Sequence, residues 1–433
     1  MKHRSIDRRA FLASASASAA AAPWWASCQT GPKPQAVANA PVKEVPPSEQ
    51  ITLGLIGMGI RGRSVMTRYF LTNPAVRILA VCDVDQTRRE HFKGLIDKNY
   101  GSTACGSYVD YRDLLARQDI DAVVIATPDH WHVTQCLHAL AAGKDIYCEK
   151  PLTHTLAEGK LLIDAVQRHK RVFQTGSQQR TEFGQRFVQA VEYIRSGRIG
   201  DLLTVTVGVG DPPKPCDLGA EKIEPGLDWD RWLGPAPLRP YNSILSPRGI
   251  IKHYPQWRRY NEYAGGGLAD MGAHHFDIVQ WALGADTSGP VEALPPALGT
   301  KMRGARLRYK DGLVVTHGGP GDAIFIGTKG MIQVDRGRIT SFPDKILKQP
   351  LAKSDFHVPR HKNHGTDWLE CIKSRRDPTC TAEIGARSAA VCQLANLAYH
   401  HGKPIQWDPI GWKFADDTDP ALLDYDRRPA YRV

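Results

Sequence analysis

Short apolar runs alternate with amphipathic stretches through the first half of the chain. Runs compatible with buried β-strands lie at residues 51–56, 76–82, 121–126, 144–148 and 171–174. Helix-like patterns, with apolar residues three or four positions apart, lie at 64–70, 110–117, 130–141 and 155–169. Strands that alternate with helices are typical of a parallel, doubly wound sheet with helices on both faces. We therefore predict a doubly wound α/β domain over residues 51–175.

The second half of the chain combines short strands with separate helices. Strands are predicted at 201–209, 306–309, 313–317, 323–327 and 331–334, and helices at 183–196, 363–374 and 384–400. Residues 210–264 form a long irregular stretch rich in tryptophan, tyrosine and arginine. Loops of this length are usually functional, and we predict a substrate-side insertion that includes Trp257 and Arg258. The alternative is that it braces an interface between subunits.

The first predicted strand runs directly into a glycine-rich turn. The turn has the spacing G-x-G-x-x-G and consists of Gly57, Met58, Gly59, Ile60, Arg61 and Gly62. Glycine here permits a tight turn, brings the backbone close to a pyrophosphate and lets the next helix pack on the strand. The second strand ends at Asp83, 21 residues after Gly62. A carboxylate there binds the adenosine ribose and repels a 2′-phosphate, so we predict NAD. NADP remains the alternative because two arginines, Arg88 and Arg89, lie nearby.

The stretch KDIYCEKPL, residues 144–152, places a lysine just after a predicted buried strand. Open parallel sheets bind their ligands beyond the carboxyl ends of the strands. Pro151 stiffens the turn that follows Lys150. We predict that Lys150 points into this crevice and takes part in chemistry, with a solvated turn lysine as the alternative.

Several motifs, in this order, resemble the glucose-fructose oxidoreductase/inositol dehydrogenase/MocA family. They are the glycine turn, Asp83, TPDHWH at 127–132, EKP at 149–151 and GGGLADMGAH at 265–274. The resemblance spans about residues 51–409. It implies a Rossmann domain followed, over residues 176–433, by an α+β domain with an open, mainly antiparallel sheet. In that family the second domain forms the substrate site and often the oligomer contact, so we expect a homodimer or homotetramer.

The resemblance also implies roles for three residues. His274 would act as the base, and Asp270, four positions earlier on the same helical face, would orient it and favour its charged form. Lys150 would bind the reacting oxygen and stabilise developing negative charge. The expected reaction is hydride transfer between a hydroxyl carbon of a carbohydrate, glycoside or cyclitol and the nicotinamide of NAD.

Other candidate residues belong to the same two sites. Beside the glycine turn, the cofactor set comprises Thr127, Pro128, His132, Glu149 and Lys150, with His130 and His132 at the nicotinamide rim. The substrate set comprises Arg180, Trp257, Arg258 and His275. His275 and Asp277 could suggest a metal site, but spacing ties no further ligand to them, so no metal is predicted.

Three other functions stay open. An NAD-dependent glycosidase would oxidise a glycoside transiently, eliminate the aglycone and return the hydride. The known glycosidase branch resembles this chain in its Rossmann half and typically lacks the lysine of the EKP motif, which favours an oxidoreductase. The others are a non-catalytic sugar-binding protein of the cell envelope and a surface interaction module. The glycine turn together with the Lys150, Asp270 and His274 set argues against the sugar-binding protein, and a catalytic assay across glycosides would test the interaction module.

Composition fits a two-domain globular protein. The chain has 433 residues, of which 42% are hydrophobic and 23% charged. A formal charge of +11 could indicate nucleic-acid binding. However, the basic residues are dispersed and no nucleic-acid motif is present, so we predict no nucleic-acid partner. Apart from Cys28, eight cysteines are scattered without a CxxC pair, which indicates free thiols.

Residues 1–28 have the layout of a twin-arginine signal. Arg8 and Arg9 precede a weakly apolar Ala/Ser run that is too short and small-sided to span a membrane. A disordered basic tail is the alternative. We expect export of the folded protein by the twin-arginine machinery to the periplasm, with residues 29–50 as a linker. The residues before Cys28 resemble a lipoprotein cleavage box, so a lipid anchor at Cys28 is a further option.

Export has a consequence for the cofactor. Nicotinamide cofactors are made in the cytoplasm and are not expected free outside it. An exported dehydrogenase must therefore carry its cofactor along, and we predict that NAD is tightly bound.

Overall fold

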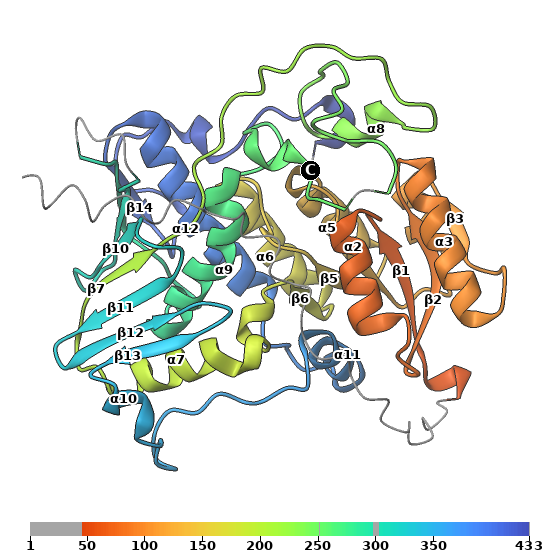
Figure 1. Ribbon diagram of the computed structural model, residues 1–433. Coiled ribbons are helices and arrows are strands. Elements are labelled where there is room, and N and C mark those ends of the chain that lie inside the picture. The colour runs from red at the N-terminus through yellow and green to blue at the C-terminus, as the bar shows by residue number, and fades with distance from the viewer. Residues whose placement is uncertain (1–45, 251, 298–302, 433) are drawn as a thin grey trace, which may run out of the picture. The chain divides into compact units, whose positions relative to one another are not determined.

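Six parallel strands form the first sheet, in the order β3-β2-β1-β4-β5-β6 (Figure 1). The computed structural model describes residues 46–250, 252–297 and 303–432. The predicted export segment, Cys28 and most of the predicted linker lie outside the described residues. The strands are β1 (Ile51–Ile56), β2 (Val76–Cys82), β3 (Gly106–Tyr108), β4 (Ala122–Ile125), β5 (Asp145–Cys148) and β6 (Phe173–Thr175). The prediction of a doubly wound parallel sheet is confirmed.

Helices cover both faces of this sheet. One face carries α2 (Ile60–Val65), α3 (Gln86–Tyr100) and α11 (His364–Ser374), and the other carries α4 (Tyr111–Leu115), α5 (His132–Ala141) and α6 (Leu156–His169). The central strands β4 and β5 are fully buried, which explains their continuous apolar runs. Helix α6 begins where Thr155 and Glu158 form a capping box. Helix α11 comes from the far end of the chain, and its Trp368 packs edge-on against Phe70.

The second sheet has nine strands in the order β13-β12-β11-β7-β10-β9-β8-β14-β15. Its neighbouring strands are antiparallel except for the parallel pair β7 and β10. The strands are β7 (Leu202–Val207), β8 (Glu292–Leu294), β9 (Arg306–Arg308), β10 (Val314–His317), β11 (Ala323–Gly327), β12 (Gly330–Val334), β13 (Ile339–Phe342), β14 (Ile405–Asp408) and β15 (Lys413–Phe414). This mainly antiparallel sheet confirms the predicted fold class.

Three helices pack against the second sheet, and one of them, α12 (Ala382–His401), also contacts the first domain. The other two are α7 (Arg186–Arg195) and α9 (Gly266–Ala282). Helices α7, α9 and α12 contact the second sheet, and α12 also packs against both α9 and α6. The apolar residues of this region belong to one continuous core that extends into the first sheet. The two sheets therefore hold α9, which carries His274, close to the end of β5, which carries Lys150.

The described part of residues 210–264 has a small core of its own. It includes α8 (Trp229–Leu233) and a 3-10 turn at Gln256–Arg259. Its apolar core contains Trp229, Trp232, Tyr241, Trp257 and Tyr263, and the rings of Trp229 and Trp232 stack 4.6 Å apart. An irregular stretch with this core can hold a fixed shape and position side chains.

The structure also describes the cysteines and the apolar helices. The eight cysteines within them are all free and buried, as expected for thiols. No helix in the described ranges is long and apolar enough to cross a membrane.

Candidate active site

The glycine turn is tight at its two ends and open in its middle. Gly57 has φ of +87°, and a Cβ there would lie 2.7 Å from the backbone of Ala126. A Cβ on Gly62 would lie 2.1 Å from the carbonyl oxygen of Gly57, so this glycine allows close packing of α2. A Cβ on Gly59 would meet nothing within 4 Å. The turn thus exposes backbone at Gly59, where a phosphate can approach.

Asp83 lies at the end of β2 beside this turn. Its Oδ2 accepts a hydrogen bond of 2.6 Å from the backbone N–H of Met58, and its Oδ1 accepts one of 2.9 Å from that of Asp85. Burial raises the pKa of Asp83, while Arg88 acts in the opposite direction. A carboxylate can accept about four hydrogen bonds, so Asp83 can still bind ribose hydroxyls. The side chain of Met58 is buried and contributes packing.

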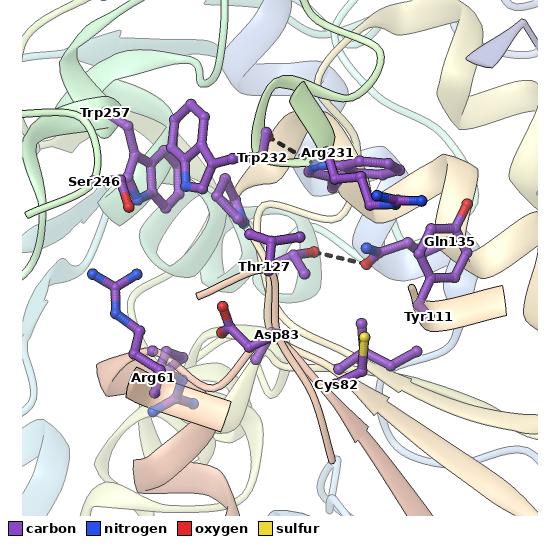
Figure 2. Close-up of a pocket in the computed structure, with 18 of the residues that line it drawn as sticks. Arg61, Cys82, Asp83, Tyr111, Thr127, Gln135, Arg231, Trp232, Ser246 and Trp257 are labelled. Carbon is purple, nitrogen blue, oxygen red and sulfur yellow. Dashed lines mark hydrogen bonds between the residues drawn. The ribbon is translucent and has the colours of Figure 1, made fainter. Parts of the chain in front are cut away.

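An elongated cavity of about 950 Å³ lies along the carboxyl ends of β1, β2 and β4. Its walls include Gly57, Gly59, Ile60, Arg61, Asp83, Thr127 and Pro128 from the predicted cofactor set. We call this space the dinucleotide cavity. Figure 2 shows Asp83 and Cys82 on one side, with Trp257, Ser246, Trp232 and Arg231 on the opposite side. The open face at Gly59 and the carboxylate at the end of β2 fit a dinucleotide.

The 210–264 stretch covers the dinucleotide cavity. On the β2 side, the N–H of Gln86 donates to the carbonyl of Gly226 at 2.9 Å, and the N–H of Asp228 donates to that of Val84 at 3.0 Å. On the β4 side, the indole of Trp131 donates to the carbonyl of Trp232 at 3.0 Å. The stretch is therefore attached on both sides of the cavity. It contributes Trp257, Arg258 and other residues to the wall of this cavity.

The C-terminal region adds a second part to this cover. The ring of Tyr431 lies 5.3 Å from that of Trp131, edge to face, and it lines the dinucleotide cavity. Arg428 holds this region in place through an ion pair of 2.5 Å with Asp230 of α8. Contacts from two distant segments thus surround the space where the adenosine half of a dinucleotide would lie.

A second cavity, of about 710 Å³, adjoins the first. Both share the wall residues Arg61, Ala126, Thr127, Tyr254, Trp257 and Arg258. The remaining walls are Asp129, Glu149, Lys150, Gln178, Phe183, Asp270, Met271, His274 and Arg336. We call it the substrate cavity because it brings Lys150, Asp270 and His274 next to the dinucleotide cavity.

Lys150 and Asp270 form a close pair in this cavity. The Nζ of Lys150 donates to Oδ1 and to the backbone carbonyl of Asp270, both at 2.7 Å. Burial acts to raise the pKa of Asp270, but Lys150 and Arg258 beside it bring that pKa below its ordinary value. The carboxylate is therefore ionised and holds the ammonium group at a defined place.

His274 lines the cavity without a carboxylate at its ring. Burial, together with the positive charges of Lys150 and Arg336, lowers the pKa of His274 well below 6.5. Its Nδ1 has no hydrogen-bond partner among the described residues. The expectation that Asp270 orients His274 and favours its charged form is wrong, because no hydrogen bond joins the two side chains among the described residues and the surroundings of His274 favour its neutral form. A neutral imidazole is the form that can accept a proton.

Glu149 contacts the glycine turn through an ion pair with Arg61. It is buried, accepts a hydrogen bond of 3.0 Å from Gln178 and pairs with Arg61 at 2.7 Å. Burial acts to raise the pKa of Glu149, but Arg61 brings it below its ordinary value. Glu149 therefore positions Arg61, which lines both cavities.

Three predicted site residues, Arg180, His275 and His132, line neither cavity. Arg180 is buried and pairs with Asp277 and Asp286 at 2.8 and 2.7 Å. The prediction that it faces the crevice is therefore wrong. His275 packs edge-on against Phe187 and lines neither cavity. The reason is helical geometry, since successive residues of α9 point about 100° apart and position 275 turns away from the face of position 274.

The ring of His132 is also buried away from the cavities. Its Nδ1 and Nε2 lie 2.7 and 3.0 Å from the backbone carbonyls of Pro151 and Thr127. This residue holds the EKP turn against the end of β4. It therefore supports the nicotinamide rim and does not form it. His130 is fully buried as well, with Nε2 3.2 Å from the carbonyl of Trp232.

Several cavity residues have no signal in the sequence. In the dinucleotide cavity they are Tyr111, Arg112, Gln135 and Tyr431, and in the substrate cavity Phe183 and Arg336. Only the aromatic and arginine content of 210–264 pointed toward Arg231, Trp232 and Tyr254. The others come from separate elements that meet only in the folded chain.

These features are those of the NAD-binding oxidoreductases. Residues 51–177 match the family model described as "Oxidoreductase family, NAD-binding Rossmann fold", and residues 214–433 match its "C-terminal alpha/beta domain". The chain belongs to the Gfo/Idh/MocA oxidoreductase family.

Relatives within the curated proteins carry several names. The chain is 23% identical over 386 residues to "Uncharacterized oxidoreductase YrbE" of Bacillus subtilis (strain 168), covering 83% of this chain and 97% of that protein. It is 35% identical over 153 residues to an inositol 2-dehydrogenase of Salmonella paratyphi B, covering 35% and 44%. It is 34% identical over 208 residues to glycosyl hydrolase family 109 protein 2 of Shewanella sp. (strain ANA-3), covering 46% and 44%. These last two matches span less than half of each relative.

Solved structures share the fold. The aldose-aldose oxidoreductase from Caulobacter crescentus, complexed with glycerol, aligns with a TM-score of 0.58 at 18% identity, covering 83% of this chain and 100% of that one. The WlbA dehydrogenase from Bordetella pertussis, in complex with NADH and UDP-GlcNAcA, aligns with a TM-score of 0.58 at 19% identity, covering 83% and 99%.

Proposed function

We propose that this enzyme oxidises or reduces a hydroxyl-bearing carbon of a carbohydrate, glycoside or cyclitol with NAD. The observation that carries the proposal is the wall that the dinucleotide cavity shares with a cavity lined by Lys150, Asp270 and His274. The inositol 2-dehydrogenase relative and the aldose-aldose oxidoreductase neighbour support this substrate class.

The side chains of the substrate cavity suit the proton part of this reaction. When bound, NAD supplies a nicotinamide ring that takes or returns the hydride. In the oxidation direction, neutral His274 accepts the hydroxyl proton as the C–O bond becomes a carbonyl. Lys150 hydrogen-bonds the same oxygen and stabilises its developing negative charge. Asp270 positions Lys150 through the 2.7 Å contact.

The cofactor is proposed to be NAD that stays bound through turnover. The cover made by 210–264 and Tyr431 supports slow release, and the predicted export of the folded protein to the periplasm requires it. Retention for an hour needs a dissociation rate of about 10⁻⁴ per second. At on-rates of roughly 10⁵ to 10⁶ per molar per second this gives nanomolar affinity or better, or about −12 kcal/mol. One substrate would then reduce the bound cofactor and a second would reoxidise it, with ping-pong kinetics.

An NAD-dependent glycosidase is the second candidate. The 34% identity to a glycosyl hydrolase family 109 protein over 208 residues favours it. The same two cavities would serve, because transient oxidation needs the same proton acceptor and hydride acceptor.

A substrate panel separates the two candidates. Purified enzyme, with its cofactor content first measured by mass spectrometry, is incubated with free sugars, cyclitols and aryl glycosides. A rise in absorbance at 340 nm with a free sugar or cyclitol and no acceptor, equal to the bound cofactor, or an oxidised sugar product in the presence of an added acceptor, supports the oxidoreductase. Release of the aglycone without a net change at 340 nm supports the glycosidase. If the enzyme contains NAD but shows no activity in either assay with any compound of the panel, the proposed function is wrong.

A further inference from the structure

The charges that line the substrate cavity do not balance. Its cationic side chains are Arg61, Lys150, Arg258 and Arg336, and its carboxyl groups are Asp129, Glu149 and Asp270. Glu149 pairs with Arg61 and Asp270 pairs with Lys150, each at 2.7 Å. Burial raises the pKa of Asp129 well above its ordinary value, which favours its neutral form. The charges of Arg258 and Arg336 are therefore in excess.

Arg336 is held in place without a carboxylate. It lies in the turn between β12 and β13, and its Nε donates to Oε1 of Gln179 at 3.0 Å. Gln179 is fully buried and donates in turn to the backbone carbonyl of His274 at 3.2 Å. The guanidinium carbon lies 4.8 Å from the ring centroid of Phe183. Within the part of the chain that the structure describes, Arg336 forms no ion pair.

This connection fixes the guanidinium relative to the reacting centre. Gln179 links Arg336 to the residue that carries the proposed base, while both Nη groups of Arg336 have no hydrogen-bond partner among the described residues. The side chain is open to solvent within the cavity. A guanidinium with free, forked N–H donors binds planar anions such as carboxylate, and tetrahedral ones such as phosphate, through two parallel hydrogen bonds.

Arg258 is held in a similar way on the wall shared with the dinucleotide cavity. Its guanidinium lies 4.1 Å from the ring centroid of Trp257 and 4.7 Å from that of Tyr254. Its Nε lies 3.7 Å from Oδ1 of Asp270, a carboxylate that Lys150 already engages more closely. A substrate placed between His274 and this wall would meet a positive field on both sides.

The neighbouring Arg338 provides the contrast. It lies two residues further along the same turn, but it pairs with Asp322 at 2.8 Å and with Asp335 at 3.7 Å, and it lines neither cavity. The turn therefore directs one arginine to the cavity with its donors free and the next to a local ion pair.

We infer that Arg336, assisted by Arg258, is a specificity-determining residue that binds a negatively charged group on the substrate. The preferred substrate is then an anionic sugar, bearing a carboxylate or a phosphate, in place of a neutral one. This inference rests on the proposed function, because it assigns the substrate class of the same cavity.

The test measures binding, and turnover comes from the substrate panel described above. Isothermal titration of the NAD-containing enzyme with glucuronate, glucose 6-phosphate and glucose is compared for the wild type, Arg336→Met, Arg336→Lys and the control Arg338→Met. We expect one of the two anions to bind at least ten times more tightly than glucose. Arg336→Met should weaken that anion by about 10- to 100-fold and glucose by less than twofold. Arg336→Lys should restore part of the loss, and Arg338→Met should match the wild type.

The outcomes identify the anionic group that Arg336 binds or show that it binds none. Arg336-dependent binding of glucuronate assigns a carboxylate, and such binding of glucose 6-phosphate assigns a phosphate. Glucose binding as tightly as both anions, or an equal loss for anion and glucose in Arg336→Met, overturns the inference. If Arg336 is needed for anion binding but no sugar is oxidised, the anion subsite is supported and the proposed function is wrong. Unchanged circular dichroism and cofactor content establish that the variants are folded.

Discussion

The Nζ of Lys150 lies 2.7 Å from Oδ1 of Asp270, although the two residues are 120 positions apart in the chain. This contact joins the turn after β5 to helix α9, and it places a charged donor beside His274 in the substrate cavity. In the proposed reaction, Lys150 binds the reacting oxygen and neutral His274 accepts its proton.

Lys150→Met should lower turnover by about 10²-fold or more, because it removes the donor that stabilises charge on the oxygen. NAD should stay bound, since the glycine turn and Asp83 are untouched. Turnover and cofactor content are measured on the same preparation. Lys160→Met is the matched control, because Lys160 pairs with Asp164 on the surface of α6. Unchanged turnover in Lys150→Met would exclude Lys150 from the chemistry.

The pH dependence should reflect the lowered pKa of His274. Neutral His274 is the active form, and protonation inactivates it. Because its pKa in the folded enzyme is well below 6.5, kcat/KM should stay level as pH falls to 6.5 and should decline only at lower pH. In Arg336→Met, loss of a nearby positive charge raises the His274 pKa, so the decline should begin at higher pH. A neutral sugar is used as substrate, and Arg338→Met should follow the wild-type curve.

An acid limb at or above pH 6.5 in the wild type would contradict this assignment. So would an acid limb that survives in His274→Ala at the wild-type position, because another group would then set it. Both profiles are obtained at constant ionic strength so that screening does not change with pH.

Asp83→Ser should raise the affinity for NADP relative to NAD. The substitution removes the carboxylate that repels a 2′-phosphate, and it leaves Arg88 in the wall of the dinucleotide cavity. The ratio of the two dissociation constants is measured by fluorescence titration of cofactor-free protein. An unchanged ratio would mean that the adenosine ribose is held by other residues.

Cofactor retention should depend on the cover of the dinucleotide cavity. We expect the purified, dialysed enzyme to contain stoichiometric NAD and to follow ping-pong kinetics. Tyr431→Ala should raise the NAD dissociation rate by about tenfold, because part of an aromatic wall is lost. Arg432→Ala is the control, since Arg432 is exposed and pairs with Asp426 away from the cavity. Dissociation is followed by stopped-flow displacement.

Recovery of empty protein that needs millimolar NAD for activity would overturn the retention proposal. If NAD dissociates at the same rate from Tyr431→Ala and the wild type, the C-terminal region does not contribute to cofactor retention, although retention itself is not contradicted.

Local chemistry explains what the sequence alone could predict. Alternating apolar runs and helical periodicity determine a doubly wound sheet, because backbone hydrogen bonding and burial act over a few residues. The glycine turn and Asp83 can be recognised in the sequence because they follow strand ends at a fixed spacing, and Gly62 lies against Gly57 of the same turn. The family resemblance then extended the prediction to the mainly antiparallel second sheet, which short strands alone do not specify.

Tertiary structure decided which side chains became partners. Sequence spacing put Asp270 on the face of His274, but only the folded chain brings Lys150 close enough to take its carboxylate. Arg180 follows a strand end as a ligand-binding residue should, yet Asp277 and Asp286 surround it in the core. Arg336 and Tyr431 reach the cavities from a hairpin turn and the C-terminal region. The physical reason is that Coulomb attraction and burial act between groups close in space, whereas periodicity records neighbours along the chain.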